Sequence, residues 1–442
     1  MNDRSTGAGE AAAHYDRGVL LENSNDLTGA RSAYQRVVAL DSGHVEALAS
    51  LAWLDAQAGD SLSARAWSEL ALELHGANVL ARMALAFADL QDRQLDAAGH
   101  RLAQLYADPA LTPLNRSIVL GLIGDLNDAQ GDAARAYKAY DAANAQLKAL
   151  CPEFADSALG HARRLTAWFE AADREQWRNP PEARAEATDP KAHIFLVGFP
   201  RSGTILLETV LAGHPEVVTL EERDSLAQAA DAFLSSSEGL ERLANISPDE
   251  AQTQRDFYWS AVRDFGVEPR GRVFIDKMPL ATMLLPLISQ LFPNARVLFA
   301  VRDPRDVVLS CFRRRFGMNA AMYELLTLDG AATYYNAVMT LADVYRELLP
   351  IPQHIVRYES LVEDFESTAR AVCDFVGLDW TPAMADIAAT ARARGITTPS
   401  AAQLAAGLNR DGQGTWRRYR EQMSPVLPVL EPWVKRFGYL PN

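Results

Sequence analysis

The sequence predicts an α-helical repeat domain followed by an α/β domain built on a parallel sheet. Three observations support this division. Small residues recur at a fixed step in the first third of the chain, prolines and polar residues interrupt it near residues 178–191, and short apolar runs followed by glycine-containing or basic turns recur beyond that point. The 442 residues suffice for two domains of ordinary size, and 48% hydrophobic with 23% charged residues is a globular composition.

The helical part is expected over residues 11–150. Its small residues form two series with a step of 34 residues: Gly18, Ala52 and Ala86, and Ala30, Ala64 and Ala98. After a short insertion the matching positions of a fourth unit are Gly124 and Ala136, and Tyr140 follows Ala136 as Tyr34 follows Ala30. Such a period predicts two antiparallel helices in each unit, with the small residues where the helices cross closely. Since one unit cannot bury its apolar faces alone, neighbouring units must stack.

This pattern resembles the tetratricopeptide repeat over about residues 11–147, although the Trp and Pro positions of that repeat are mostly absent. An ordinary alanine-rich helical bundle is the alternative. The resemblance implies a concave surface that binds an extended peptide or another partner, and such arrays often mediate homodimers. Nothing in this part of the sequence points to catalysis.

Residues 151–191 are expected to form a helical extension and then a linker. The helical pattern persists to Trp177, after which the segments NPPEAR (residues 179–184) and TDP (188–190) break it. Paired prolines among polar residues mark a connection between domains. The second domain is therefore expected over residues 192–442.

The second domain begins with a candidate anion-binding loop. The run IFLV (residues 194–197) predicts a buried strand, GFPRSGT (198–204) a turn bracketed by glycines, and ILLETVLAG (205–213) a helix that ends at glycine. Strand, glycine loop and helix together bind phosphate, because backbone N–H groups and the helix dipole point at the anion. A plain strand-to-helix turn is the alternative.

The loop differs from the magnesium-dependent nucleotide loop, G-x-x-x-x-G-K-[ST]. Gly198 and Gly203 keep its spacing, but Thr204 stands at the Lys position and Ile205 at the Ser/Thr position that holds magnesium. A kinase or other phosphotransferase is therefore disfavoured. The positive charge lies inside the loop, at Arg201, which favours metal-free transfer from a nucleotide that ends in a phosphosulfate.

The segment PRSGT (residues 200–204) resembles the 5′-phosphosulfate-binding loop of sulfotransferases, which use 3′-phosphoadenosine 5′-phosphosulfate (PAPS) and release 3′-phosphoadenosine 5′-phosphate (PAP). The resemblance is to tyrosylprotein sulfotransferases and to bacterial tetratricopeptide-repeat sulfotransferases, over about residues 192–440. It implies a P-loop-like fold. The cofactor contacts it implies in this loop are Pro200, Arg201, Ser202, Gly203, Thr204 and Ile205.

A second cofactor element is expected after the run RVLFAV (residues 296–301), which predicts another buried strand. This strand ends at Arg302, and the following helix contains Ser310. Ligands of such sheets bind at the carboxyl ends of the strands. In the resembled family an Arg and a Ser at this spacing hold the 3′-phosphate of the cofactor. A salt bridge of Arg302 with Asp303 or Asp306 is the alternative.

Four more positions match cofactor-binding positions of the resembled family. Arg314 stands at a further basic position and Tyr358, in RYESL (residues 357–361), beside the nucleotide. Ser400 opens a segment that closes over the adenine and 3′-phosphate, and Trp416 stands at the closing aromatic position. The alternatives are a solvated helix face around Arg314 and core positions for Tyr358 and Trp416.

Sulfuryl transfer to a hydroxyl requires a base for the acceptor proton and cations for the charge that develops on the reacting groups. Glu222 is the base candidate, since it lies 21 residues after Arg201, as the proposed base of tyrosylprotein sulfotransferases does. Glu221 is its rival, and a helix that begins at both glutamates is the alternative. The cation candidates are Arg201 and Lys277. Lys277 follows a third apolar run, VFI (residues 273–275), and its family counterpart faces the leaving phosphate; a surface turn is the alternative.

Three departures from the family pattern motivate a second hypothesis. Ile205 replaces a Thr that often donates to the 5′-phosphate, Ala281 a frequent Asn, and Thr415 or Gly414 a basic residue before Trp416. The main hypothesis is a PAPS-dependent sulfotransferase that acts on a hydroxyl acceptor, such as a tyrosine of a peptide or protein, with the repeats recruiting the acceptor or a partner. The alternative is a non-catalytic repeat scaffold with a degenerate sulfotransferase domain.

The net charge, the cysteines and the apolar segments of the sequence indicate which partners and which cellular location to expect. A net charge of −14 argues against nucleic-acid binding, which needs a basic face. Cys151, Cys311 and Cys373 suit neither a disulfide framework nor a zinc site, and the chemistry requires no metal. The first residues lack the apolar core of a signal peptide, and no run approaches a membrane span. We therefore expect a cytoplasmic protein with no metal, membrane or nucleic-acid partner.

Overall fold

The computed structural model describes residues 3–24, 26–155, 157–183, 189–394, 410 and 412–440. Within these residues the chain divides into two compact units. The first consists of the chain up to Pro152, with the short segment Arg313–Arg315 and a segment that begins at Ala391. The second consists of Glu153–Phe312, Phe316–Thr390 and the described C-terminal residues, from 410 onward.

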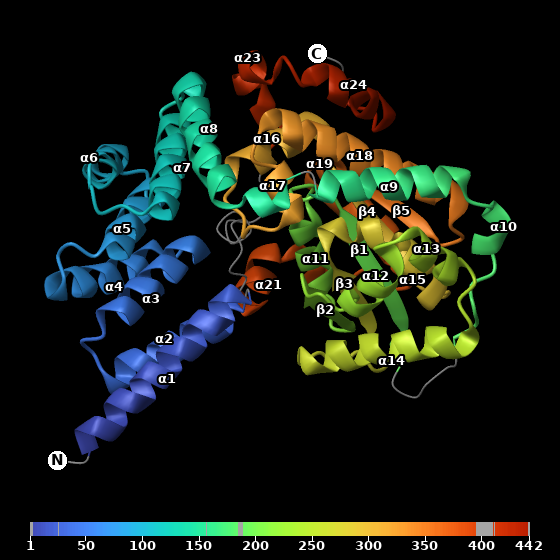
Figure 1. The fold of residues 1–442 in the computed structure, drawn as a ribbon, viewed down its shortest axis with the longest axis horizontal. Coiled ribbons are helices and arrows are strands. Elements are labelled where there is room, and N and C mark those ends of the chain that lie inside the picture. Colours follow the sequence, from blue (N-terminus) through green and yellow to red (C-terminus); the bar gives the residue numbers. More distant parts are fainter. Residues whose placement is uncertain are drawn as a thin grey trace. The chain divides into compact units, whose positions relative to one another are not determined.

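Up to Pro152 the described residues form eight helices (Figure 1). They are α1 Asp3–Asn23, α2 Leu27–Leu40, α3 Val45–Ala58, α4 Ser61–Leu74, α5 Val79–Gln91, α6 Leu95–Tyr106, α7 Pro113–Ala129 and α8 Ala133–Leu150. Aspartate side chains accept the first free N–H groups where α2, α4 and α8 begin, at Asp26, Asp60 and Asp132. Gly59, in the left-handed conformation, ends α3.

The recurring small residues of this unit lie where helices pack closely. The side chains without exposed surface include Ala30, Ala64, Ala98 and Ala136. A Cβ atom on Gly18 would lie 2.5 Å from Cε1 of Tyr34, and one on Gly124 would lie even closer to Tyr140. These glycines therefore let a tyrosine ring of the next helix approach the backbone, as the residue types predict.

A pair of substitutions in α1 tests this packing. Alanine favours a helix over glycine by roughly 1 kcal/mol, and position 9 has open space around it among the described residues. At position 18 the new methyl group meets the ring of Tyr34, which is buried and donates a hydrogen bond of 2.9 Å to Glu22. We expect Gly18→Ala to lower the free energy of unfolding by about 1–2 kcal/mol in urea denaturation, and Gly9→Ala to keep or raise it. Equal changes in the two variants would contradict the close contact.

The second unit is built on a five-stranded parallel sheet with the strand order β2-β3-β1-β4-β5. The strands are β1 Ala192–Gly198, β2 Val217–Glu221, β3 Val273–Lys277, β4 Arg296–Val301 and β5 Gln353–Arg357. Because every neighbouring pair is parallel, all five carboxyl ends lie along one edge of the sheet. The apolar runs predict β1, β3 and β4. The edge strands β2 and β5 are not predicted, and Glu221 ends β2 instead of beginning a helix.

Helices cover both faces of the sheet (Figure 1). All of β3, and all but the first residues of β1 and β4, are buried, although successive side chains of a strand point to opposite faces. α11 (Thr204–Ala212) packs on β1, β2 and β3, and α9 (Ser157–Ala171) packs on α18 (Leu328–Leu348).

The other α-helices of this part are α10 Arg174–Trp177, α12 Ala227–Leu234, α13 Ser237–Ala244, α14 Pro248–Asp264, α15 Leu285–Leu291, α16 Pro304–Arg313, α17 Ala320–Glu324, α19 Tyr358–Glu363, α20 Phe365–Val376, α21 Ile387–Arg394, α23 Arg420–Met423 and α24 Leu427–Arg436. In the described part of the chain, no helix has both the length and the apolar character needed to cross a membrane.

Candidate active site

The candidate site lies along the edge where the five strands end. The residues that end or follow the strands are loop 198–204, Glu222, Lys277, Arg302 and Tyr358. The register of β2 and β3 places Glu221 opposite Lys277. The topology therefore brings the predicted residues of five distant segments to one edge, which is where open α/β sheets bind their ligands.

The loop after β1 depends on two glycines. A Cβ atom on Gly198 would lie 2.5 Å from the carbonyl oxygen of Ala300, so the neighbouring strand leaves no room for a side chain. Gly203 has a φ of +98° and lies against the ring of Tyr358. Arg201 also has a left-handed backbone, with a φ of +69°, which costs a non-glycine residue roughly 1–2 kcal/mol. Such conformations are concentrated at functional sites.

Several hydrogen-bond donors surround this loop. The hydroxyl of Ser202 is buried and has no hydrogen-bond partner in the described part of the chain. α11 begins at Thr204, directly after the loop, so its first N–H groups have no acceptor within the helix. Nε of Arg201 donates to the hydroxyl of Ser310 on α16, at 3.1 Å. The structure thus brings Ser310 to Arg201, and the role of Ser310 with Arg302 at the 3′-phosphate stays a prediction.

Arg302, directly after β4, has 8% of its surface exposed. One of its Nη atoms donates to the carbonyl oxygen of Arg201 at 3.2 Å, and the other donates to that of Gly412. Its guanidinium carbon lies 4.7 Å from the centre of the Tyr358 ring. Nε of Arg302 has no hydrogen-bond partner among the described residues. One buried donor of this arginine is therefore available to a ligand.

Neither Asp303 nor Asp306 forms a salt bridge with Arg302, so that alternative is wrong. Asp303 pairs with Arg305 through two hydrogen bonds of 2.9 and 2.8 Å. Asp306 accepts the backbone N–H groups of Gly414 and Trp416, at 2.6 and 2.9 Å. Burial raises the pKa of Asp306 to about 6, although Arg302 and these N–H groups favour its charged form.

Trp416 lies in the segment that Asp306 holds. Its ring centre is 4.2 Å from the guanidinium carbon of Arg305, and only 2% of its surface is exposed. Tyr358 begins α19 and is partly exposed between Gly203 and Arg302. Of the two aromatic residues, Tyr358 therefore contacts both the loop and Arg302, while Trp416 packs beside them on Arg305.

Lys277 is the centre of a buried charge cluster. Its Nζ lies 2.7 Å from Oε1 of Glu222, 3.2 Å from Oε1 of Glu221 and 3.5 Å from Oε2 of Glu208. The side chains of Lys277 and Glu208 have no exposed surface. Burial alone lowers the pKa of Lys277, but the carboxylates of Glu208, Glu222 and Glu221 together outweigh it and raise this pKa. The contribution of the Lys277 ammonium group to stability is therefore fully present below its ordinary pKa of 10.5 and is lost as the pH rises through the higher folded value.

Glu222 is also held by its backbone. Its N–H donates to the carbonyl oxygen of Lys277 at 2.8 Å, and its φ is +48°. The Glu222 side chain has the shorter contact with Lys277 and is more exposed than that of Glu221, 36% against 29%. A base must be reached by an acceptor and must be held in place, and both properties favour Glu222.

Glu208 is a residue of this cluster that the sequence analysis does not single out. It is the one charged residue in the apolar helix TILLETVLA of α11. A buried carboxylate in such a helix requires a partner of opposite charge, which is the signal that would have identified it.

Other positions that the sequence singles out do not belong to this set of strand-end residues. Arg314 belongs to the first compact unit, and Ser400 lies outside the described residues. Ile205 is in the first turn of α11, and Ala281 is buried. The described residues contain no group of three or more His, Cys, Asp or Glu side chains arranged to hold a metal ion.

Comparison with known proteins identifies the family that this domain matches. Residues 193–382 match the family model described as Sulfotransferase family. The matched segment contains the loop after β1, Glu222, Lys277, Arg302 and Tyr358. The C-terminal domain is a sulfotransferase-family domain.

Relatives of this chain support that family. An uncharacterized protein of Aquifex aeolicus is 25% identical over 280 residues, 60% of this chain and 35% of that protein. Protein-tyrosine sulfotransferase 2 of Gallus gallus is 30% identical over 198 residues, 42% of this chain and 52% of that protein. Protein-tyrosine sulfotransferase 1 of Danio rerio is 26% identical over 264 residues, 56% of this chain and 72% of that protein. The chain thus spans about a third to a half of the first two of these relatives.

Removal of Lys277 from the sulfotransferase domain leaves three carboxylates without their cation. We expect Lys277→Met to lower the free energy of unfolding by about 3–5 kcal/mol at pH 8. The loss should be smaller at pH 5, because carboxylates without a cation have raised pKa values and take up protons as the pH falls. Urea denaturation at both pH values measures the difference.

Lys435→Met is the matched control. Lys435 forms an exposed ion pair with Glu431 at 3.3 Å, so its loss should change the free energy of unfolding by less than about 1 kcal/mol. A loss for Lys277→Met that is as large at pH 5 as at pH 8 is the result that contradicts the charge cluster.

Proposed function

We propose that the protein is a PAPS-dependent sulfotransferase that moves a sulfuryl group to a hydroxyl of an acceptor. The observation that carries the proposal is the convergence of the loop after β1, Arg302 and the Glu222–Lys277 pair on one edge of a sulfotransferase-family domain. Phosphate-binding donors and a candidate base there occupy one site.

The residues at this edge fit the donor nucleotide. The buried Nε of Arg302 and hydroxyl of Ser202 are polar atoms without hydrogen-bond partners in the described ranges, and each needs an acceptor. Arg302 with the neighbouring Tyr358 would hold the 3′-phosphate and the nucleotide. Ser202, Arg201 and the first N–H groups of α11 would hold the 5′-phosphosulfate, with support from Ser310 on Arg201.

The bound donor supplies an activated sulfuryl group on a phosphate leaving group. Glu222 takes the proton from the acceptor hydroxyl at Oε1 or Oε2, while its φ of +48° and its contact with Lys277 fix the carboxylate. Arg201 and Lys277 stabilise the negative charge that grows on the transferred and leaving oxygens. Nζ of Lys277 contacts three carboxylates, and with the donor bound one of its N–H groups would turn to the leaving phosphate. No metal takes part in these steps.

The acceptor is proposed to be a hydroxyl of a peptide or protein, including that of tyrosine. One support is that relatives of this chain are named protein-tyrosine sulfotransferases. Another is the helical unit up to Pro152, which would recruit the acceptor or another partner. Incubation of the protein with ³⁵S-labelled PAPS and a cell extract tests the activity: transfer of label to protein is expected, and label only on small molecules would overturn the peptide acceptor.

A non-catalytic scaffold is the second candidate function. It is favoured by the contacts of Lys277 with three carboxylates and by the carbonyl of Gly412, which already accepts from Arg302. Calorimetry with PAP separates the two. We expect the wild-type protein to bind PAP. The scaffold is favoured if no binding is seen with a dissociation constant of tens of micromolar or tighter, which corresponds to a binding free energy of about −6 to −7 kcal/mol.

Arg302→Ala tests the cofactor site. Loss of the guanidinium should weaken PAP binding about 10–100-fold in calorimetry, because charged hydrogen bonds to phosphate are lost. Arg296→Ala is the matched control: it removes an arginine from the amino end of the same strand, where Arg296 donates to the carbonyl of Phe375 at 2.6 Å. Equal affinities of the two variants for PAP would place the 3′-phosphate elsewhere.

Glu222→Gln tests the base. The amide keeps the shape of the side chain but cannot take a proton, so turnover should fall by about 10²–10⁴-fold while PAP affinity stays within a few-fold. Glu221→Gln is the control, with most of the turnover retained. The label-transfer assay measures both variants. Near-normal turnover of Glu222→Gln, with loss in Glu221→Gln, would assign the base to Glu221.

A further inference from the structure

The face of β3 opposite to Lys277 carries a second polar cluster, which the transfer chemistry does not use. Asp276 precedes Lys277 on β3, so its side chain points to the other face of the sheet, and only 3% of it is exposed. Asp276 accepts hydrogen bonds from the hydroxyls of Ser225 and Tyr258, each at 2.8 Å. Nε2 of His193 lies 2.8 Å from the Tyr258 oxygen.

The direction of the hydrogen bonds follows from the proton count. A tyrosine hydroxyl has one proton, and Tyr258 uses it in the hydrogen bond to Asp276. The Tyr258 oxygen therefore accepts a hydrogen bond from Nε2–H of His193. Burial lowers the pKa of His193 to about 3, so the imidazole is neutral and this network assigns its one proton to Nε2. Burial also raises the pKa of Asp276 to about 6, while the two hydroxyls favour its charged form. His193, Tyr258 and Asp276 thus form a continuous buried chain of hydrogen bonds.

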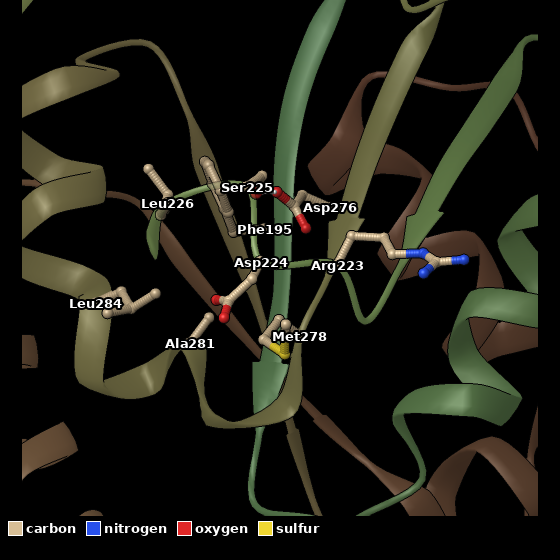
Figure 2. A pocket seen from close by; sticks show the side chains of 9 residues that line it. All are labelled: Phe195, Arg223, Asp224, Ser225, Leu226, Asp276, Met278, Ala281 and Leu284. Atoms are coloured by element: carbon tan, nitrogen blue, oxygen red, sulfur yellow. Dashed lines mark hydrogen bonds between the residues drawn. The ribbon is translucent and has the colours of Figure 1, made fainter. Parts of the chain in front are cut away.

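Ser225 connects this chain to the segment after β2. Figure 2 shows the Ser225 and Asp276 side chains turned toward one another at a small pocket, beside Phe195. Leu226, Met278 and Leu284 add apolar surface to the same pocket. Breaking the hydrogen bond between Ser225 and Asp276 would deprive the buried Asp276 carboxylate of one of its two hydroxyl donors, which is costly.

The segment Glu222–Ser225 is held at both ends by adjacent residues of β3. At its start, the N–H of Glu222 donates to the carbonyl of Lys277. At its end, the Ser225 hydroxyl donates to Asp276. Between these points the backbone of Glu222 has a φ of +48°. A non-glycine residue keeps that conformation only where its surroundings impose it.

We propose that Asp276 is a positioning residue, which, with Tyr258 and His193 behind it, holds Ser225 to the sheet and thereby keeps the Glu222 carboxylate beside Nζ of Lys277. The role in catalysis rests on the proposed function, since it takes Glu222 as the base. The placement of the segment itself does not depend on donor or acceptor.

The test combines amide hydrogen exchange of the full chain with turnover. Ser225→Ala removes the donor to Asp276, and Asp276→Asn replaces the charged acceptor by an amide. We expect exchange at the Glu222 amide to accelerate about tenfold in Ser225→Ala while amides of β1 and β4 keep their protection. Turnover should fall by a similar factor, with PAP affinity and the KM for the donor within about two-fold of the wild type.

Two further variants separate positioning from a general loss of stability. Ser225→Thr keeps a hydroxyl and should restore both protection and turnover. Ser235→Ala is the matched control, because Ser235 is exposed and donates only within its own helix region, to the carbonyl of Asp231 at 2.7 Å. It should leave both readouts unchanged.

The possible failures are distinguishable. Unchanged exchange at Glu222 in Ser225→Ala, or a uniform acceleration over the whole sheet, overturns the positioning role whatever the turnover. If Asp276→Asn does not fold, the two serine variants still decide. If the wild-type protein neither binds PAP nor transfers sulfate, the proposed function is wrong, and exchange at Glu222 still decides whether Asp276 positions the segment.

Discussion

The buried ammonium group of Lys277 is the interaction on which the geometry of the site depends. An uncompensated charge without exposed surface costs several kcal/mol, and here Glu208, Glu221 and Glu222 offset that cost. Glu208 comes from α11, the two other glutamates from the end of β2, and Lys277 from the end of β3. These elements cannot separate without leaving buried charge unpaired, so the cluster fixes the helix after the anion loop relative to the candidate base.

The hydrogen-bond donors at the ends of β1 and β4 differ from those around Lys277 at the end of β3. Nζ of Lys277 donates to the carboxylates of Glu221 and Glu222, and these two glutamates remain partly exposed. Around Arg302 and Ser202 buried donors have no partner in the described part of the chain. The carboxylates at the end of β2 can therefore take a proton from an acceptor hydroxyl, and the donors at the ends of β1 and β4 can bind an anion. On the proposed function, the exchange of Lys277 from carboxylate to phosphate links these two sets of residues.

The sequence predicts those features that depend on local pattern. The runs at residues 194–197, 273–275 and 297–301 are fully apolar because β1, β3 and β4 are covered on both faces, and they identify these strands. β2 and β5 are edge strands with partly exposed residues, VVTLE and QHIVR, and their mixed pattern does not distinguish them from loops.

Features that arise from tertiary contacts are beyond this kind of prediction. Nε of Arg201 donates to the hydroxyl of Ser310, 109 residues further along the chain, and the spacing of Arg302 and Ser310 does not reveal this contact. Glu208 acquires its role only when α11 packs over β3. The network of His193, Tyr258 and Asp276 joins residues from β1, α14 and β3, and no local motif announces it. Residue types thus identify the chemistry, and the strand order decides which residues meet.

A crystal structure of the protein with PAP is the most direct test of a nucleotide site at this sheet edge. We expect the 3′-phosphate within hydrogen-bond distance of Nε of Arg302, the 5′-phosphate against Ser202 and the first turn of α11, and Nζ of Lys277 within reach of the 5′-phosphate. PAP bound elsewhere, or a 5′-phosphate far from loop 198–204 with Lys277 on the other side of the sheet from it, would contradict this assignment.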